Sequence, residues 1–547
     1  MSEHVVVAPL VVALVTAILT LGTRRYPRGQ RAVSLLGIGA YAVAVLALAS
    51  RVVPLGVLTG SGGTTETLTY QVSNWPAPFG ISLVADALSA FMLVLAVAVV
   101  VPALVFSALY VEEFAQRVSY HSLFHFMLAG VTGAFLTGDI FNLFVWFEVM
   151  LMPSYVLVVF YGRAEHTRAA LQYTVLNLLG SAVMLVAIGG IYATVGTLNM
   201  ADIARRLAHA GEFGIDPAPV LGLGAILFAV FALKAGIVPF QFWVPAAYRA
   251  APAPIAAVMA GVTKKVGIYA IIRLLFTVFG TATVGGGLAP ARIAEGLGFG
   301  MAGKSFLGLF GPVLFLMAIG SILLGGLGAV SRNDLDDILA YSSIGQVGFI
   351  VLALALAATG PQAVRTAGLI AALVYSLNHA IAKSALFLIS GTVYEAVGSI
   401  RFDALGGLST RRPILASSFF LGGIALVGIP PLTGFFGKLL VFDTAGKAIV
   451  AGEPFAGVAL IVALAGAVLT IAYVSRAWNR AFWGSPSDPV TRSYQPTALV
   501  AVVAAFVLLV AVLGIGFDPV YRAAEAAAHA ATDRTEYVEA VAPEVIG

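Results

Sequence analysis

Five lysines lie inside long apolar stretches of this chain of 547 residues. A lysine at the centre of a lipid bilayer costs roughly 2.5–3.5 kcal/mol on insertion scales, so five of them without a role would weigh heavily on the fold. A buried lysine can lose its proton, whereas a buried arginine cannot, so lysines at this depth predict groups that take up and release protons. The five are Lys234, Lys264, Lys265, Lys383 and Lys438.

Each of these lysines has an alternative explanation, in which the amine reaches the lipid headgroups or satisfies a helix end. For the adjacent pair Lys264 and Lys265, we expect only one of the two to line a common path, because neighbouring residues on a helix point about 100° apart. The arginines fall in the predicted loops or at the ends of apolar segments, and none is expected at the depth of the five lysines.

Glu148 is the acidic counterpart of these lysines. Its apolar segment begins near Asp139, which places the carboxylate about 13 Å deep, close to the middle of a bilayer. A carboxylate in apolar surroundings needs a proton or a cation, and Lys234 is the natural candidate for the cation. We therefore predict that the two form a pair whose separation sets the proton affinity of the lysine. The alternative is a purely structural ion pair.

Two apolar segments carry helix breakers beside their lysine: residues 219–248 beside Lys234, and residues 412–441 beside Lys438. Proline removes a backbone hydrogen bond, and such a break is tolerated in a membrane only where protein or water satisfies the freed groups. Breaks at corresponding places in two halves favour a transporter built from repeated units, with ion sites at the breaks. The breakers are Gly236 and Pro239 in the first segment, and Pro430, Pro431 and Gly434 in the second.

Histidine and hydroxyl side chains accompany the lysine at 383. His379 precedes Lys383 by four residues and shares its helix face, where a neutral imidazole can relay protons; the alternative is a histidine with a structural hydrogen bond. Residues 341–346 (YSSIGQ) offer hydroxyls and an amide that would hold water between lysines. His121 and His125 also share a face but lack a nearby carboxylate, so we expect no metal site there.

Composition places the whole chain in a membrane. Hydrophobic residues make up 60% and charged residues 10%, with a mean hydropathy of +0.99, whereas a soluble chain carries roughly 25% charge. The net charge of +4 therefore gives no argument for binding nucleic acid. The absence of cysteine excludes disulfides, cysteine-ligated zinc, iron–sulfur clusters and thiol catalysis. We expect no metal and no cofactor.

Fourteen apolar segments are long enough for helices that span a bilayer, which takes about 20 residues each. They predict an all-α polytopic membrane protein with two broken helices, the seventh and the twelfth. The segments are 5–22, 32–53, 80–109, 119–137, 139–161, 168–195, 219–248, 253–279, 306–330, 335–358, 366–397, 412–441, 454–482 and 497–517. The first lacks a basic leader, so we expect a span rather than a cleaved signal.

The segments group into four regions, and the loops between them are too short for a catalytic domain. The regions are N-terminal helices (1–110), a first group of five spans (119–279), a second group of five (306–482), and a last span with its tail (497–547). More of the loop arginines fall on the inner side if the N-terminus lies outside, so we predict that both termini lie outside. Arg273 is assigned to an outer loop in this arrangement.

Six motifs resemble, in family order, the antiporter-like subunits shared by respiratory complex I and the Mrp cation/proton antiporters. They extend over roughly residues 80–440. The motifs are FNLFVWFEVMLMPSY, FALKAGIVPFQFWVPAAY, APAPIAAVMAGVTKKVGIYAIIR, LAYSSIGQVGF, SLNHAIAKSALFLISG and GIPPLTGFFGK. Two further stretches, NWPAPFGISLVADALSA and YATVGTLNMADIA, look most like the D-type subunits of the Mrp antiporters. The acidic loop 333–338 departs from the family pattern, which is usually basic there.

The resemblance implies two inverted five-helix repeats and a hydrated chain of side chains across the membrane plane, with half-channels to each side. It implies that Lys265 rather than Lys264 is the family's lysine in the eighth span. The relay it implies consists of Glu148 and Lys234 as a pair, Lys265, His379 with Lys383, and Lys438 as the terminal group.

The resemblance further implies a proton-translocating subunit of a multisubunit Na+/H+ antiporter in a bacterial plasma membrane, with other membrane subunits as partners and H+ and Na+ as its ions. This is a secondary transporter rather than an enzyme. The alternative is a proton-pumping membrane subunit of a redox enzyme, either a complex I-like NADH:quinone oxidoreductase or a membrane-bound hydrogenase. A passive channel fits less well, because titratable lysines suit coupling better than conduction.

Overall fold

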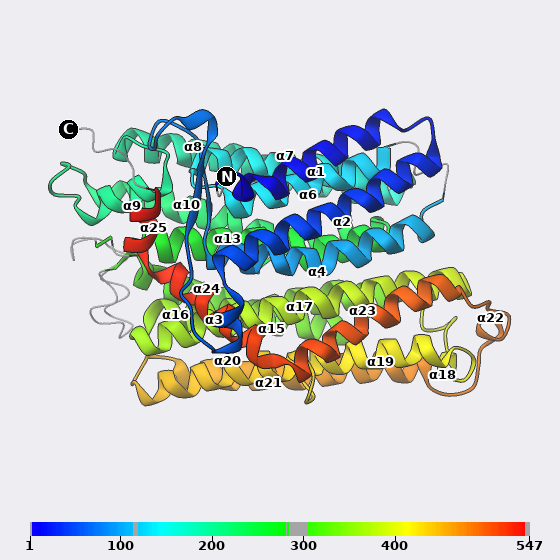
Figure 1. Ribbon diagram of the computed structural model, residues 1–547. Helices are drawn as coiled ribbons and strands as arrows, with labels where there is room; N and C mark the ends of the chain where they lie inside the picture. Colours follow the sequence, from blue (N-terminus) through cyan, green and yellow to red (C-terminus); the bar gives the residue numbers. More distant parts are fainter. Residues whose placement is uncertain (1–2, 113–118, 281, 284–304, 542–547) are drawn as a thin grey trace.

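The computed structural model describes residues 3–112, 119–280, 282–283 and 305–541. Within these ranges, long helices run side by side as one bundle, and the loops gather at its two ends (Figure 1). Twelve of the helices described are long and apolar enough to cross a membrane. The chain is therefore an all-α polytopic membrane protein, as predicted.

A short antiparallel hairpin interrupts the N-terminal helices and shortens the predicted third span. Residues 82–85 pair with 68–71, from Ser82 opposite Gln71 to Ala85 opposite Leu68, instead of extending the helix. Asp86 then caps the following helix by accepting a bond of 2.9 Å from the backbone N–H of Ser89. The elements are α1 (His4–Gly22), α2 (Pro27–Val52), α3 (Leu55–Thr59), β1 (Leu68–Gln71), η1 (Val72–Asn74), β2 (Ser82–Ala85) and α4 (Ala87–Tyr110).

The first group of five predicted spans contains four uninterrupted helices and one helix in two pieces. Its last helix, residues 253–278, alternates α-helical and π-helical turns, which the sequence did not predict. The elements are α6 (His121–Leu136), α7 (Ile140–Val158), α8 (Ala164–Val195), α9 (Met200–Ala208), α10 (Pro217–Ala235), α11 (Trp243–Ala250), α12 (Ala253–Val258), η3 (Met259–Thr263), α13 (Lys264–Ile271) and η4 (Ile272–Val278).

The second group has the same plan, with the interrupted helix again fourth of five. The elements are α15 (Phe306–Val330), α16 (Leu335–Thr359), α17 (Gln362–Val397), α18 (Leu408–Arg411), α19 (Pro413–Val427), α20 (Thr433–Val450), α21 (Ala456–Ala477) and η6 (Trp478–Phe482). Three further helices follow the short α22 (Asp488–Thr491): α23 (Thr497–Ile515), α24 (Phe517–Thr532) and α25 (Arg534–Val541). Because α6 and α19 have only 16 and 15 residues, the count of fourteen spans and their inverted relation stay predictions.

Both interruptions begin with a glycine in the left-handed region, where a side chain is strained. The helix α10 ends at Ala235 before Gly236, with φ of 64°, and α19 ends at Val427 before Gly428, with φ of 91°. Pro239 lies in the first gap, and Pro430 and Pro431 lie in the second.

Gly434 is not part of the second gap, contrary to the prediction. It is the second residue of α20, and a Cβ atom there would lie 1.7 Å from the carbonyl oxygen of Ala425. The lack of a side chain at Gly434 therefore allows α20 to pack closely against α19, and Gly434 does not interrupt the helix.

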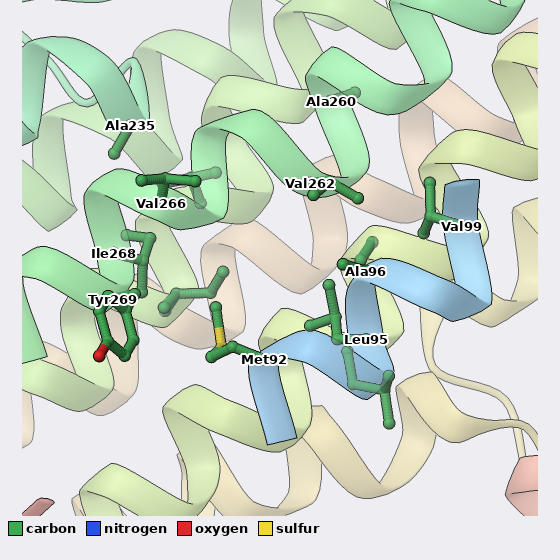
Figure 2. Packing of buried hydrophobic residues seen from close by; sticks show 14 of the residues in the cluster. Met92, Leu95, Ala96, Val99, Ala235, Ala260, Val262, Val266, Ile268 and Tyr269 are labelled. Atoms are coloured by element: carbon green, nitrogen blue, oxygen red, sulfur yellow. The ribbon is translucent and has the colours of Figure 1, made fainter. Parts of the chain in front are cut away.

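The helix of residues 253–278 and α17 form the centre of the bundle. Every residue in the apolar window of each of these helices is buried. Figure 2 shows side chains of α4 that pack beside the 253–278 helix; those labelled are Met92, Leu95, Ala96 and Val99. This central position keeps the lysines of α13 and α17 far from lipid.

Both ends of the described chain lie at the same end of the bundle. The ring of His4 lies 5.7 Å from that of Tyr70 in β1, and Thr67 beside β1 donates a bond of 2.7 Å to the carboxylate of Glu536 in α25. This agrees with placing both termini on one side of the membrane; which side faces outward stays a prediction. Of the predicted outer loop 280–305, residues 281 and 284–304 lie outside the described residues.

The assignment of Arg273 to an outer loop was wrong. Arg273 lies in η4, is 1% exposed, and pairs with Asp86 at 2.7 Å. The rings of Tyr269 and Tyr537 lie 5.4 and 4.8 Å from its guanidinium carbon. Tyr537 belongs to α25, so a helix from the far end of the chain covers this arginine. Local hydropathy contains no information about such a cover.

Asp86→Asn should therefore lower the free energy of unfolding by about 3–5 kcal/mol, because it leaves the buried Arg273 without its counter-charge. Thermal melting of the purified assembly in detergent measures the change. Asp403→Asn is the matched control, since its ion pair with Arg401 is exposed, and it should leave the melting temperature unchanged. Equal melting temperatures for the two variants would contradict a stabilising role for the buried pair.

Candidate functional site

All five lysines singled out from the sequence are buried in the helix bundle. Their side chains are at most 4% exposed, so none extends to the headgroups and that alternative is excluded. Lys234 lies on α10, Lys264 and Lys265 on α13, Lys383 on α17 and Lys438 on α20. They occupy the two broken helices and the two central helices.

Glu148 and Lys234, which are predicted to form a pair, hydrogen-bond to side chains of α8 rather than to each other. Ser181 of α8 donates a hydrogen bond to Glu148, while Lys234 Nζ donates to the hydroxyl of Tyr173, also on α8, at 3.3 Å. Among the described residues, Glu148 and Lys234 form no ion pair within 4 Å. Tyr173 and Ser181 are eight residues apart, about 12 Å along the helix axis.

These α8 side chains were not predicted as part of the site, although the sequence contains a signal for them. Tyr173, Asn177 and Ser181 follow one another at intervals of four within an apolar helix, which places all three on one face. Asn177 is also buried, and its amide donates to the carbonyl oxygen of Tyr173 at 2.8 Å. A polar stripe on an apolar helix predicts polar partners on neighbouring helices. Here Glu148 is the partner of Ser181, and Lys234 is the partner of Tyr173.

The adjacent lysines of α13 point to different neighbours, as their angle on the helix predicted. Lys265 Nζ lies 2.5 Å from Nδ1 of His379 on α17. The amine of Lys264 lies at the break in α10 instead, where a Cβ atom on Gly236 would be 3.2 Å from it. Its nearest aromatic ring is that of Tyr248, whose centre is 5.9 Å away.

Hydroxyl groups of α16 contact both predicted groups of α17. His379 Nε2 lies 3.2 Å from Ser343 Oγ. Lys383 Nζ donates to Ser342 Oγ and, at 3.2 Å, to the carbonyl oxygen of Leu339. The predicted YSSIGQ segment therefore supplies the polar surroundings of the central histidine and lysine.

A group of polar side chains continues from Lys383 into the second half of the bundle. The ring of Tyr473 lies 6.0 Å from Lys383 Nζ, and its hydroxyl accepts a bond of 2.8 Å from the amide of Gln346. Tyr375 donates to the same amide at 2.5 Å and packs against Gly437, the residue before the last lysine.

Lys438 lies at the second break. Its Nζ donates a bond of 2.8 Å to the carbonyl oxygen of Val427, the last residue of α19. That carbonyl has lost its helical partner at the break, so the lysine satisfies a helix end, as one of the alternatives expected. The same contact places an ammonium group at the negative end of a helix.

A polar vestibule opens at the end of the bundle opposite α25. One cavity of about 710 Å³ is lined by α4, α11, α16 and α17 side chains, and a second of about 490 Å³ adjoins it. Both are lined by His166, Arg249 and Asp336. The residue of α17 that lines this vestibule and is nearest in sequence to Lys383 is Ser390, seven residues or two helical turns away.

Comparison with known proteins gives consistent matches over the whole chain. A family model described as NADH:quinone oxidoreductase/Mrp antiporter, TM, matches residues 137–285 and 304–466, which is more than half of the chain. The chain is 33% identical over 544 residues to the D-type subunit of the Na(+)/H(+) antiporter of Alkalihalophilus pseudofirmus, covering 99% of this chain and 100% of that protein.

Two solved structures have the same fold. A chain of the Mrp complex from Dietzia sp. DQ12-45-1b aligns with a TM-score of 0.83 at 27% identity and covers 99% of both chains. A chain of the membrane-bound sulfane sulfur reductase, an archaeal respiratory membrane complex, aligns with a TM-score of 0.83 at 26% identity, covering 98% of this chain and 99% of that one.

The vestibule and the buried site predict different reactivity of introduced thiols, and the natural chain has no cysteine to interfere. Glu395→Cys, at an exposed position lining the vestibule, should react with a membrane-impermeant thiol reagent from one side of the membrane only. Ser384→Cys, on the same helix but fully buried, should remain unlabelled. Labelling of intact and everted vesicles measures both. On the predicted orientation Glu395→Cys reacts from the cytoplasmic side, and reaction from the other side alone would reverse the orientation.

Proposed function

Because this chain belongs to the NADH:quinone oxidoreductase/Mrp antiporter family of membrane proteins, we propose that it is the D-type, proton-translocating subunit of a multisubunit Na+/H+ antiporter in a bacterial plasma membrane. Its full-length similarity to a D-type antiporter subunit and to a chain of an Mrp complex supports this. Its partners are then other membrane subunits, and its role is that of a transporter subunit rather than an enzyme.

One observation carries the proposal: four of the five buried amines, those of Lys234, Lys265, Lys383 and Lys438, contact polar groups of neighbouring helices. The amine of Lys264 is buried without a hydrogen-bond partner among the described residues. The relay comprises Glu148, Lys234, Lys264, Lys265, His379, Lys383 and Lys438. Lysines suit this task because a buried amine can be neutral or charged, and four of these amines have hydrogen-bonding partners nearby.

Glu148 controls the relay through its distance from Lys234. The negative carboxylate attracts the protonated amine, and the attraction falls as the two groups separate. In the arrangement described above the two are bound to different residues of α8, Ser181 and Tyr173. A movement of α7 relative to α8 that lengthens the distance between Glu148 and Lys234 would lower the proton affinity of Lys234. The proton would then pass towards Lys265.

Proton entry then supplies the free energy for cation export. Each elementary charge that crosses the membrane exchanges about 2.3 kcal/mol per 100 mV. The relay accounts for proton movement in this subunit; the proposal assigns no path for Na+ through it.

A second candidate function is a proton-pumping subunit of a redox-driven membrane complex. The likeness to the membrane-bound sulfane sulfur reductase favours it, with a TM-score equal to that for the Mrp complex. Identification of the subunits that purify with this chain separates the two. Small membrane subunits alone fit the antiporter, whereas flavin or iron–sulfur proteins fit the redox complex.

Glu148→Ala and Lys234→Ala should each abolish Na+/H+ antiport without preventing assembly, because each removes one member of the controlling pair. Antiport is measured as Na+-induced collapse of a pH gradient in everted vesicles from a host without its own antiporters. Glu212→Ala, at an exposed position, is the control and should retain wild-type activity. Wild-type rates in both relay variants would refute the assignment.

Lys265→Ala and His379→Ala should reduce antiport by similar factors, and the double variant should be no worse, because the two side chains act through one contact of 2.5 Å. Lys264→Ala should reduce the rate less, since its amine points to the α10 break. The same vesicle assay measures all four variants. Additive losses for Lys265 and His379 would show that they act independently.

A further inference from the structure

Asp336 connects the polar vestibule to the interior of the bundle. It is the second residue of α16 and lines both cavities of the vestibule. Its Oδ1 accepts a bond of 2.6 Å from the hydroxyl of Ser390 on α17, and Ser390 also lines the larger cavity. The carboxylate is therefore fixed at the junction of two central helices and lines both cavities of the vestibule.

The same two helices lead from Asp336 to Lys383. The amine of Lys383 donates to the carbonyl oxygen of Leu339, three residues after Asp336, or about 4.5 Å along the axis of α16. On α17, Ser390 follows Lys383 by seven residues, two helical turns, so both lie on the same face. Along α17, the central lysine is thus about two helical turns, or roughly 10 Å, from the hydroxyl that binds this carboxylate.

Several charged groups surround this carboxylate. Arg249 of α11 pairs with the neighbouring Asp337, at 3.2 Å, rather than with Asp336. Asp334, which caps the N-terminus of α16, precedes Asp336 by two residues. The other charged or titratable groups that line the vestibule are Arg31, Tyr110, Glu112, Tyr161, Arg163, Glu165, His166, Arg168, Tyr394 and Glu395.

We propose that Asp336 exchanges protons between the vestibule water and Lys383, so that it is the carboxylate at the mouth of the relay. This rests on the proposed function of the buried lysines. The protonated carboxyl gives its proton, through water or the hydroxyl of Ser342, to neutral Lys383, and the resulting carboxylate takes a new proton from the vestibule. The reverse sequence releases a proton.

A carboxylate is suited to this position because free protons are scarce near neutral pH. A fixed acid that borders water collects protons from buffer and passes them on, a role that typically accelerates proton transfer by 10²–10⁴-fold. Asp336 also lies in the first turn of α16, where a negative charge stabilises a helix without any transport role. The experiment must distinguish these two explanations.

The test uses the assembled complex in everted vesicles, with antiport rates measured against pH on the vestibule side. Asp336→Asn retains the size of the side chain but not the exchangeable proton, and it should lower the rate about tenfold or more. Asp336→Glu should retain most of the activity. Asp403→Asn, an exposed aspartate at the same end of the bundle, should match the wild type.

A small membrane-impermeant buffer, MES, should restore much of the rate of Asp336→Asn in a concentration-dependent manner, because it can enter the vestibule and accept the protons that leave the relay on this side. Ser390→Ala retains the carboxylate but removes its hydrogen-bond donor, which disfavours the ionised form. It should shift the midpoint of the rate–pH curve to higher pH, and it tests the proposal even if Asp336→Asn fails to assemble.

The failures are distinguishable. Wild-type rate and pH profile in Asp336→Asn, with antiport abolished in Lys383→Ala, would overturn the role of Asp336 and leave the relay intact. A loss of antiport in Asp336→Asn that MES does not restore, together with a similar loss in Asp336→Glu, would indicate a structural role for Asp336. This result would also overturn the proposal. Wild-type antiport in Lys383→Ala would refute the relay itself, and the inference would fall with it.

Discussion

The cost of placing an amine in a membrane determines most of this architecture. An ammonium group away from water is stable only if neighbouring groups replace its hydration, and a neutral amine is stable there only if its nitrogen finds a donor or a polar surface. The bundle provides such groups by packing helices that carry hydroxyls, an imidazole and free carbonyls against those that carry lysines. Lys234, Lys265 and Lys383 accordingly each contact a polar side chain of a neighbouring helix.

The two broken helices show how the backbone contributes to this environment. At the second break, the carbonyl oxygen of Val427 binds Lys438, so an interruption that would be unfavourable against lipid becomes a ligand for a cation. At the first break, the amine of Lys264 lies beside Gly236, where a larger residue would meet it. The breaks and the lysines are thus parts of one solution, which explains why they occur together in the sequence.

Sequence could predict the features that depend on single residues against their local background. Lysines in apolar segments, and glycine and proline beside two of them, are visible without any tertiary information. The binding of Glu148 and Lys234 to different residues of α8 depends on how three helices pack. The burial of Arg273 depends on a helix more than 250 residues further along the chain. Gly434 was assigned to the wrong role for the same reason, since its constraint comes from the carbonyl of Ala425 rather than from its own neighbours.

The cover that α25 places over Arg273 bears on how the protein is made. Synthesis proceeds from the N-terminus, so Asp86 and Arg273 are both in the membrane before Tyr537 leaves the ribosome. The hydrogen bond of 2.8 Å from the hydroxyl of Thr277 to the carbonyl oxygen of Ala531 likewise forms only after Ala531 has been translated. Arg273 is therefore covered only after α25 has been translated, and a chain truncated before α25 would present an uncovered guanidinium to the quality-control proteases of the cell.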